Sequence, residues 1–180
     1  AVFQDFGKYP LSLGENIGIS KTADLENKKK LESAIERGGL SYLQEKFPEG
    51  FATLLGKEFS GKELSFGEWQ KLAISRLFFR DAPVIVMDEP TASLDPNSEY
   101  EVFQRLIQAF EGRTVFLITH RLNSVKMCDK ILLLKNGNIL EEGSHEDLMQ
   151  QKGEYARLFS LQASGYQVKE GAEPVLQEAT

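Results

Sequence analysis

Short runs of apolar residues mark the strands that this chain is expected to form. Residues 84–87 and 114–118 are predominantly apolar runs of strand length, and both include β-branched residues. Such runs are typical of strands that are buried on both faces of a sheet. Asn136-Gly137 lies between two further runs, and this dipeptide favours a type I′ hairpin turn. The predicted strands are residues 1–3, 84–87, 114–118, 130–134 and 138–141.

Apolar residues spaced three and four positions apart predict helices around these strands. The clearest helix begins at Ser65, runs to about residue 80, and has Trp69, Leu72 and Leu77 on one side. Ser65 also opens the S-x-x-E pattern of a capping box, which predicts that the helix begins there. The predicted helices are residues 24–37, 41–47, 65–80, 96–111, 145–150 and 154–163, and the predicted loops are 6–13 and 48–67.

The composition is that of an ordinary soluble globular protein, and it restricts the possible functions. The 180 residues are 41% apolar and 27% charged, and the net charge is −6. A negative chain lacks the basic surface that nucleic-acid binding requires, so we expect no nucleic-acid partner. No apolar run approaches the ~20 residues of a membrane span. A single cysteine, Cys128, excludes an internal disulfide and fits a reducing compartment.

Polar residues with catalytic potential follow three of the predicted strands. Gln4 follows the first strand, Asp88 and Glu89 follow the second, and His120 follows the third. Open α/β sheets bind ligands at the carboxyl ends of their strands. One acid that holds a metal ion, next to a second that activates a water molecule, would suit nucleotide hydrolysis. Gln4 is either a polar cap of its strand or an amide placed near a metal ion or phosphate.

Two stretches resemble phosphate-binding elements. Residues 56–62 match most of the P-loop pattern G-x-x-x-x-G-K-[ST], but Glu63 stands where a Ser or Thr would bind magnesium. Because a carboxylate there would also repel a phosphate group, we predict that this stretch is not a P-loop. Ser65 and Gly67, in contrast, lie at the start of a helix, where unpaired N–H groups and the helix dipole favour an anion.

Five motifs in order make residues 1–163 resemble the nucleotide-binding domain of ATP-binding cassette (ABC) transporters from the Q-loop onward. The matching segments are Gln4 (Q-loop), residues 64–68 (the LSGGQ signature), 84–89 (Walker B and the following glutamate), 92–95 (D-loop) and 119–121 (switch histidine). The hairpin and residues 143–148 are most similar to the exporter branch, in which membrane helices precede this domain. The resemblance implies a fragment that lacks the Walker A motif.

The fold that this resemblance implies is α/β. It is a partial P-loop NTPase (RecA-like) core with an inserted α-helical subdomain. The implied segments are residues 1–5 and 78–165 for the core, 6–77 for the helical subdomain with the signature, and 166–180 for a flexible C-terminal tail. Missing core strands would leave an apolar face and an edge of the sheet exposed.

The resemblance also implies roles for individual residues. The implied catalytic residues are Glu89, as general base, and His120, in contact with the γ-phosphate. The implied ligands of Mg²⁺ are Asp88 and Gln4. The residues implied to bind ATP are Gln4 and, across a head-to-tail dimer, Ser65, Phe66, Gly67, Glu68 and Asp95. Phe66 replaces a small residue of the family and is expected to point away, and Glu68 replaces a glutamine and gains a role in the capping box.

The implied function is an ATPase module that powers transmembrane export. ATP and Mg²⁺ would be held between this domain and a second nucleotide-binding domain, in a homodimer or a heterodimer. A transmembrane domain of the same or a partner chain would hold the module at the cytoplasmic face of the cell membrane. The chain alone is expected to be inactive. The alternatives are a non-hydrolysing partner or regulatory ABC module, and a soluble ABC ATPase that is not tied to transport.

Overall fold

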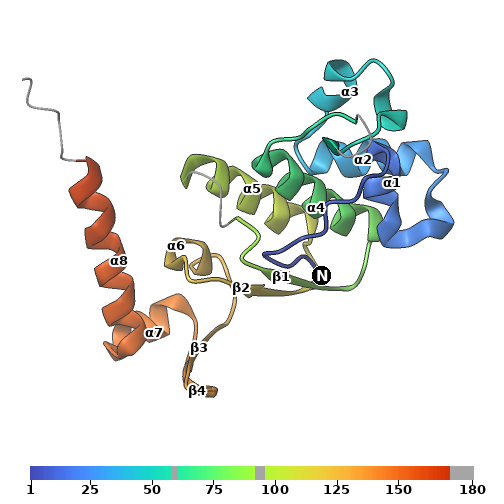
Figure 1. Ribbon diagram of the computed structural model, residues 1–180. Helices are drawn as coiled ribbons and strands as arrows, with labels where there is room; N and C mark the ends of the chain where they lie inside the picture. Colours follow the sequence, from blue (N-terminus) through green and yellow to red (C-terminus); the bar gives the residue numbers. More distant parts are fainter. Residues whose placement is uncertain (58–60, 92–95, 171–180) are drawn as a thin grey trace, which may run out of the picture. The chain divides into compact units, whose positions relative to one another are not determined.

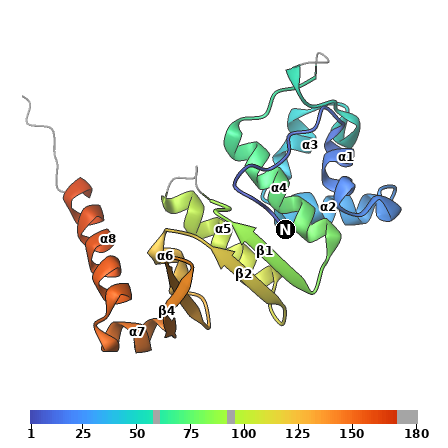
Figure 2. The ribbon, with the colours of Figure 1, turned by 60° about the horizontal axis from the view of Figure 1, so that its bottom comes forward.

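The computed structural model of the chain describes residues 1–57, 61–91 and 96–170 (Figures 1 and 2). They belong to two compact units, Ala1–Thr119 and His120–Thr180, and each is described by itself. The first unit contains α1 (Leu13–Gly18), the 3₁₀ helix η1 (Ile19–Asp24), α2 (Lys28–Arg37), α3 (Tyr42–Lys46), the 3₁₀ helix η2 (Gly50–Ala52), α4 (Phe66–Arg80), β1 (Val84–Asp88), α5 (Pro96–Ala109) and β2 (Thr114–Ile118). The second contains α6 (Leu122–Val125), β3 (Ile131–Lys135), β4 (Asn138–Gly143), α7 (His145–Gln151) and α8 (Glu154–Glu170).

The first unit is built on parallel strand pairing. β1 pairs with β2 in a register that aligns Val84 with Thr114 and Asp88 with Ile118. On the other side of β1, Val2 forms a parallel bridge to Met87. The order in space is therefore the Val2 segment, β1 and β2, all running in one direction. This arrangement confirms the strands predicted at residues 84–87 and 114–118, while the strand predicted at residues 1–3 is reduced to the bridge at Val2, and the carboxyl ends of all three segments lie at one edge.

The two strands of this small sheet are buried to different extents, and one face of β1 is the buried part. Ile85 and Met87 of β1 belong to the core, and Figures 1 and 2 both show α5 alongside the two strands. On the opposite face, Val84, Phe116 and Ile118 are 53%, 55% and 54% exposed. The prediction that β1 is buried on both faces is therefore wrong for the described part of the chain. The expected exposed apolar sheet face is present.

Helices α1, α2 and α4 pack on one another and form most of the apolar core that precedes β1. The largest fully buried side chains there are Trp69, Phe79, Leu13, Ile17, Ile35, Leu40, Leu43, Leu55 and Leu72. Each fully buried side chain of this size contributes roughly 1.5–3 kcal/mol of hydrophobic stabilisation. α4 begins and ends where its sequence pattern predicted. The boundaries 6–77 of a separate helical subdomain stay a prediction.

Two local features differ from the prediction in this region. α1 was not predicted, although Ser12 and Glu15 form a complete capping box, with 2.8 Å from the Ser12 N–H to a Glu15 carboxylate oxygen. α2 begins four residues later than expected, because the side chain of Asn27 caps it by accepting the N–H of Lys30 (3.1 Å). Asp24, the predicted cap, instead forms ion pairs with two lysines.

A buried polar network joins the middle of α4 to the loop that follows Gln4. Asn16 is completely buried, and its Nδ2 donates to the carbonyls of Tyr9, Leu11 and Ser12 at 3.0–3.1 Å. The guanidinium of Arg76 donates to the Asn16 carbonyl (2.8 Å) and to Asn16 Oδ1 (3.1 Å). Because buried polar groups are costly when unpaired, this network fixes the path of the loop over α4.

The second unit is a hairpin that packs against the helices after it. Asn136 and Gly137 have φ values of +52° and +77°, which confirms the predicted type I′ turn. Ile131, Leu148 and Tyr155 form its buried cluster. α8 runs to Glu170, so the first residues of the predicted tail are helical, and residues 171–180 lie outside the described part. No helix among the described residues is long and apolar enough to cross a membrane.

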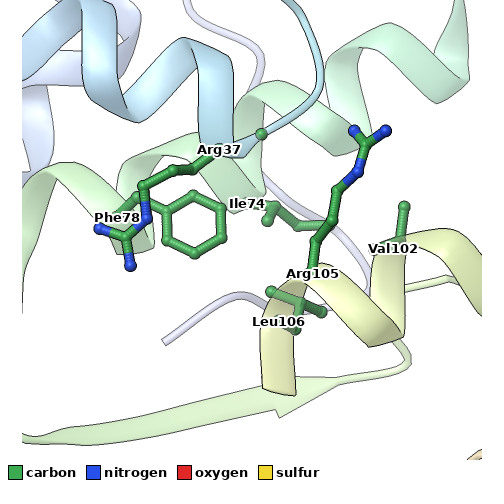
Figure 3. Close-up of a pocket in the computed structure, with 7 residues that line it drawn as sticks. Arg37, Ile74, Phe78, Val102, Arg105 and Leu106 are labelled. Carbon is green, nitrogen blue, oxygen red and sulfur yellow. The ribbon is translucent and has the colours of Figure 1, made fainter. Parts of the chain in front are cut away.

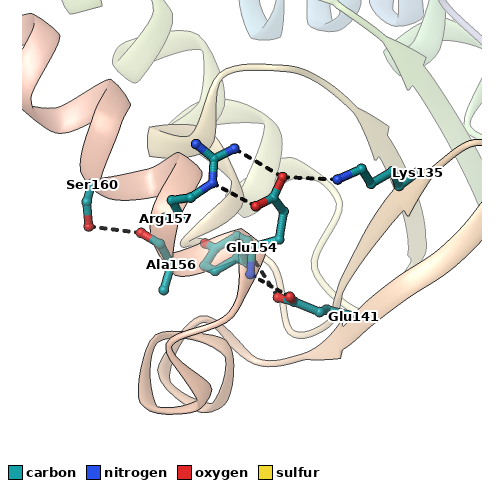
Figure 4. A network of polar contacts seen from close by, with 7 residues as sticks. Lys135, Glu141, Glu154, Ala156, Arg157 and Ser160 are labelled. Atoms are coloured by element: carbon teal, nitrogen blue, oxygen red, sulfur yellow. Dashed lines mark hydrogen bonds and ion pairs between the residues drawn. The ribbon is translucent and has the colours of Figure 1, made fainter.

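The start of α8 is fixed by carboxylates (Figure 4). Glu141 of β4 accepts the N–H groups of Glu154 (2.6 Å) and Tyr155 (3.0 Å). The Glu154 carboxylate in turn pairs with Arg157 (2.7 Å) and Lys135 (3.4 Å). The hydrogen bond from Arg157 is the main cause that lowers the pKa of Glu154 to about 2. A carboxylate at a helix N-terminus pairs with free N–H groups and with the helix dipole, so these contacts tie the helix to the hairpin.

Replacing Asn16 should destabilise the first unit strongly. In Asn16→Leu the side-chain volume is similar, but three carbonyl groups and the Arg76 guanidinium lose a partner, so we expect a loss of roughly 3 kcal/mol in the free energy of unfolding. Urea denaturation, followed through the fluorescence of Trp69, measures this loss. Ser20→Ala, which removes one local hydroxyl bond, is the control. Equal stability of the two variants would contradict the assigned role of Asn16.

Candidate functional site

The carboxyl end of β1 carries two acids in different backbone conformations. Asp88 ends the strand, and its N–H donates to the carbonyl of Val2 (2.9 Å). Glu89 follows with a φ of +47°, and its N–H donates to the carbonyl of Ile118 (2.9 Å). This left-handed conformation costs a non-glycine residue about 1–2 kcal/mol and is concentrated at functional sites. Because the strand ends between the acids, the alternation of side chains along a strand does not force them to opposite faces.

The Glu89 side chain is held by the end of the neighbouring strand. Thr119, directly after β2, donates its hydroxyl to Oε2 of Glu89 over 3.3 Å. This contact was not predicted, although Thr119 lies at a strand end beside the switch histidine. His120 begins the second unit, where its carbonyl accepts a bond from Nε2 of Gln162 (3.1 Å). That the His120 ring reaches the same nucleotide as Glu89 stays a prediction.

Gln4 lies at the same edge of the sheet as Asp88. It comes two residues after Val2, which runs parallel to β1, and it is exposed. Carboxylate and amide oxygens are suitable ligands for Mg²⁺, which proteins usually hold through one or two carboxylates together with water and phosphate oxygens. Among the described residues, no three or more His, Cys, Asp and Glu side chains cluster as a metal site. That Asp88 and Gln4 hold a magnesium ion together with a nucleotide stays a prediction.

The N-terminus of α4 presents the residues of the predicted signature motif. Ser65 is the N-cap, and its hydroxyl oxygen accepts the N–H of Glu68 (3.2 Å). The N–H groups of Phe66 and Gly67 belong to the first turn, where no helical carbonyl is available to accept them. Ser65 is exposed, as binding to a phosphate group of a second subunit requires. The binding itself stays a prediction.

Glu68 is the most heavily bonded carboxylate near this helix end. It accepts the N–H of Ser65 (2.7 Å), the hydroxyl of Tyr42 (3.0 Å) and the ammonium group of Lys46 (3.0 Å). Partial burial acts to raise its pKa, but these hydrogen bonds together hold the pKa of Glu68 below its ordinary value. Burial and the bond to Glu68 raise the pKa of Tyr42 to about 12. The contacts give Glu68 a local role in holding the helix end.

The ring of Phe66 lies beside the loop that follows Gln4. Its centroid is 5.4 Å from that of Phe6, and the ammonium group of Lys8 is 4.9 Å from the Phe66 centroid. Phe66 is 51% exposed despite these contacts. Gly67 follows it and carries no side chain that would block an approaching ligand.

Two other predictions concern glycine-rich or loop segments. Asp95, with the rest of the predicted D-loop, lies outside the described residues. In the rejected P-loop match, the N–H of Gly56 donates to the carbonyl of Lys62 (3.0 Å), and the N–H of Gly61 donates to the carbonyl of Gly56 (3.0 Å). These amides bond within their own loop and do not form a phosphate cradle. Residues 58–60 lie outside the described part.

Two cavities among the described residues of the first unit lie away from the predicted site residues. A cavity of about 10 Å³ between α2, α4 and α5 is lined by apolar side chains and two arginines (Figure 3). An open groove of about 450 Å³ beside it is lined by Glu36, Arg37, Arg105, Gln108 and Ala109. The first holds little more than one water molecule. Neither includes a residue that the sequence assigned to nucleotide binding.

Comparison with known proteins agrees with the geometry of the strand ends. The sequence profile of the family described as "ABC transporter" matches residues 1–92. The nisin transport ATP-binding protein NisT of Lactococcus lactis subsp. lactis is 36% identical over 159 residues, which are 88% of this chain and 26% of NisT. The ATP-dependent lipid A-core flippase of Burkholderia orbicola (strain AU 1054) is 37% identical over 161 residues, 89% of this chain and 26% of the flippase.

A solved structure supports the same assignment. The structure of a bacterial Atm1-family ABC exporter with ATP bound has a TM-score of 0.77 and 27% identity, and the match covers 96% of this chain and 28% of the exporter chain. The fold is therefore the α/β fold of P-loop NTPases. The chain belongs to the ABC transporter family. It spans about a quarter of the length of the curated relatives that it matches.

The contribution of Glu68 to stability should depend on pH. Because the pKa of Glu68 is lowered in the folded state, its stabilising effect is fully present above its ordinary value of 4.5 and is lost as the pH falls through the folded-state pKa. In Glu68→Gln the capping geometry is kept and the charge is lost. The stability of the wild type relative to Glu68→Gln should therefore decrease when the pH is lowered from 7 to below 4.5.

Thermal unfolding at a series of pH values measures this difference. Other carboxylates also contribute to acid unfolding, so the quantity compared is the difference between wild type and variant. Glu26→Gln, at an exposed position, is the matched control for replacing a carboxylate by an amide. A difference between wild type and Glu68→Gln that stays constant with pH would show that Glu68 is not held by these contacts.

Proposed function

We infer that this chain supplies the hydrolytic and signature parts of an ATPase that powers transmembrane export. One observation carries the inference. Parallel pairing brings Gln4, Asp88 and Glu89 to one edge of the sheet, while Ser65 is exposed at the start of α4. The exporters and transport ATP-binding proteins among its relatives support the direction of transport.

Glu89 is proposed as the general base. Its carboxylate would accept a hydrogen bond from the attacking water and take its proton as the water oxygen bonds to the γ-phosphorus of ATP. The bond from this phosphorus to the β–γ bridging oxygen would break at the same time, and ADP would leave with that bond's electron pair. The bond from the Thr119 hydroxyl to Oε2 helps to orient this carboxylate. His120 would contact the γ-phosphate and help to position the same water.

Asp88 and Gln4 are proposed to hold Mg²⁺ at the phosphate groups of ATP. The ion would supply positive charge that neutralises the phosphate oxygens. Asp88 is suited to this role because its backbone N–H is fixed by Val2 at the end of the strand. Gln4 would sense the ion from the adjacent segment.

The signature residues are proposed to act on the ATP of a second nucleotide-binding domain. The Ser65 hydroxyl and the N–H groups of Phe66 and Gly67 would bind its γ-phosphate at the positive end of the α4 dipole. Asp95 would lie at the same interface. The second domain belongs to an identical or a related chain, and a transmembrane domain of the same or a partner chain would hold both at the cytoplasmic face of the membrane.

Replacing the general base should abolish ATP turnover. In the protein as its gene encodes it, Glu89→Gln keeps a side chain that can accept the Thr119 hydroxyl but cannot take a proton, so we expect kcat to fall by roughly 10²–10⁴-fold. Steady-state phosphate release measures it, and Glu26→Gln is the matched control. If Glu89→Gln turned over ATP at the wild-type rate, the proposed role of Glu89 would be wrong.

A complementation experiment tests whether Ser65 acts on the partner's nucleotide. When Ser65→Ala and Glu89→Gln subunits are combined, one of the two sites would contain both an intact Glu89 and the intact Ser65 of the other subunit. We expect the mixed dimer to recover about half of the wild-type turnover, although each variant alone is impaired by roughly 10-fold or more. Ser144→Ala removes an equivalent capping box on α7 and controls for the loss of a helix cap. No recovery would mean that Ser65 acts within its own subunit.

A further inference from the structure

The loop after Gln4 is attached to α4 at two separate places. Near the start of the helix, Phe66 contacts Phe6 and Lys8. Farther along the helix, the guanidinium of Arg76 donates to the carbonyl of Gly7 (2.8 Å) and lies 5.0 Å from the ring centroid of Tyr9. The two attachments are ten positions apart on the helix, so they hold the loop along the helix and not at a single pivot.

The attachment at Arg76 leaves little freedom. Arg76 is largely buried, and it also bonds to the carbonyl and the side chain of Asn16. A side chain at Gly7 would lie 2.5 Å from the hydroxyl of Tyr9, so the backbone of the loop is packed directly beneath that ring. This end of the loop therefore moves only with α4.

The attachment at Phe66 is different, because it depends on a residue in which this chain departs from the LSGGQ pattern. The rings of Phe66 and Phe6 are tilted by 56° at a centroid distance of 5.4 Å, which is a favourable geometry for an aromatic pair. The Lys8 ammonium group lies within cation–π distance of the same Phe66 ring. A glycine at position 66 could make neither contact. Phe6 is two residues from Gln4, so the contact reaches the segment that carries the proposed magnesium ligand.

We propose that Phe6 and Phe66 are positioning residues that make the Gln4 loop and the signature end of α4 move as one body. The proposal rests on the function inferred above. Gln4 would meet the nucleotide of its own subunit and Ser65 that of the partner. A stiff connection between them would transmit the position of one to the other, which couples the two nucleotide sites.

A double-mutant cycle on ATP turnover tests the coupling. In the complete protein, Phe6→Leu and Phe66→Leu should each lower kcat, and the effect of the double variant should be smaller than the product of the two single effects by about two- to tenfold. KM for ATP should change little in Phe6→Leu, because Phe6 is not among the residues proposed to bind the nucleotide. Phe6→Tyr, which keeps the ring, should restore kcat. Independent, multiplicative effects would overturn the proposal, as would an increase in KM in Phe66→Leu alone.

Hydrogen–deuterium exchange provides a readout that does not depend on activity. Phe6→Leu and Phe66→Leu should increase exchange of the amides in residues 5–9 several-fold, without increasing exchange inside α4. Phe3→Leu is the matched control, because its ring is 59% exposed and lies one residue before Gln4. It should change exchange neither in residues 5–9 nor inside α4. Unchanged exchange in residues 5–9 would overturn the proposal. The two proposals can fail separately. If Glu89→Gln turned over ATP at the wild-type rate, the proposed function would be wrong, but faster exchange in residues 5–9 would still show that Phe6 and Phe66 hold the loop.

Discussion

The structure depends on the parallel pairing of three chain segments that are far apart in the sequence. The N–H of Val2 donates to the carbonyl of Val86, the N–H of Asp88 donates to the carbonyl of Val2, and the N–H of Glu89 donates to the carbonyl of Ile118, each at 2.9 Å. Parallel strands end at the same edge, so polar residues that follow each strand become neighbours without any local sequence relation. In such a site, the polar residues at the strand ends can be replaced without altering the hydrogen bonds of the sheet.

Much of this arrangement could be predicted, because its signals are local. The apolar run before Asp88 predicts a strand, the capping box at Ser65 predicts the start of α4, and the Asn136-Gly137 dipeptide predicts the hairpin. Each of these patterns fixes a backbone conformation within a few residues. The order of acids and amide along the chain then indicates nucleotide chemistry, because strand ends are the places where an α/β fold binds its ligands.

The remaining features depend on contacts between distant segments or on competition between neighbouring caps. Asp24 and Asn27 are both suitable N-cap residues. The sequence does not show that the Asp24 carboxylate forms ion pairs with two lysines, which leaves Asn27 as the N-cap. Glu89 has a left-handed conformation in which its N–H donates to the carbonyl of Ile118. The hydroxyl of Thr119 reaches the Glu89 carboxylate only when the two strands pair. Burial on both faces was wrongly inferred for β1, because an apolar run shows that a strand can be covered and does not show what covers it.

α4 shows both kinds of feature, because groups outside the helix fix both its N-terminus and its middle. Glu68 closes the cap with Ser65 and also accepts bonds from Tyr42 and Lys46 of α3, while Arg76 bonds to the loop between the Val2 segment and α1. A glutamine at position 68 would keep the cap, but it would pair less strongly with an ammonium group. Glu68 therefore makes a charged contact with Lys46 where a glutamine would make a neutral one. An exposed helix end whose cap is held by charge has its free N–H groups fixed in direction before any ligand arrives, which lowers the cost of ordering them on binding.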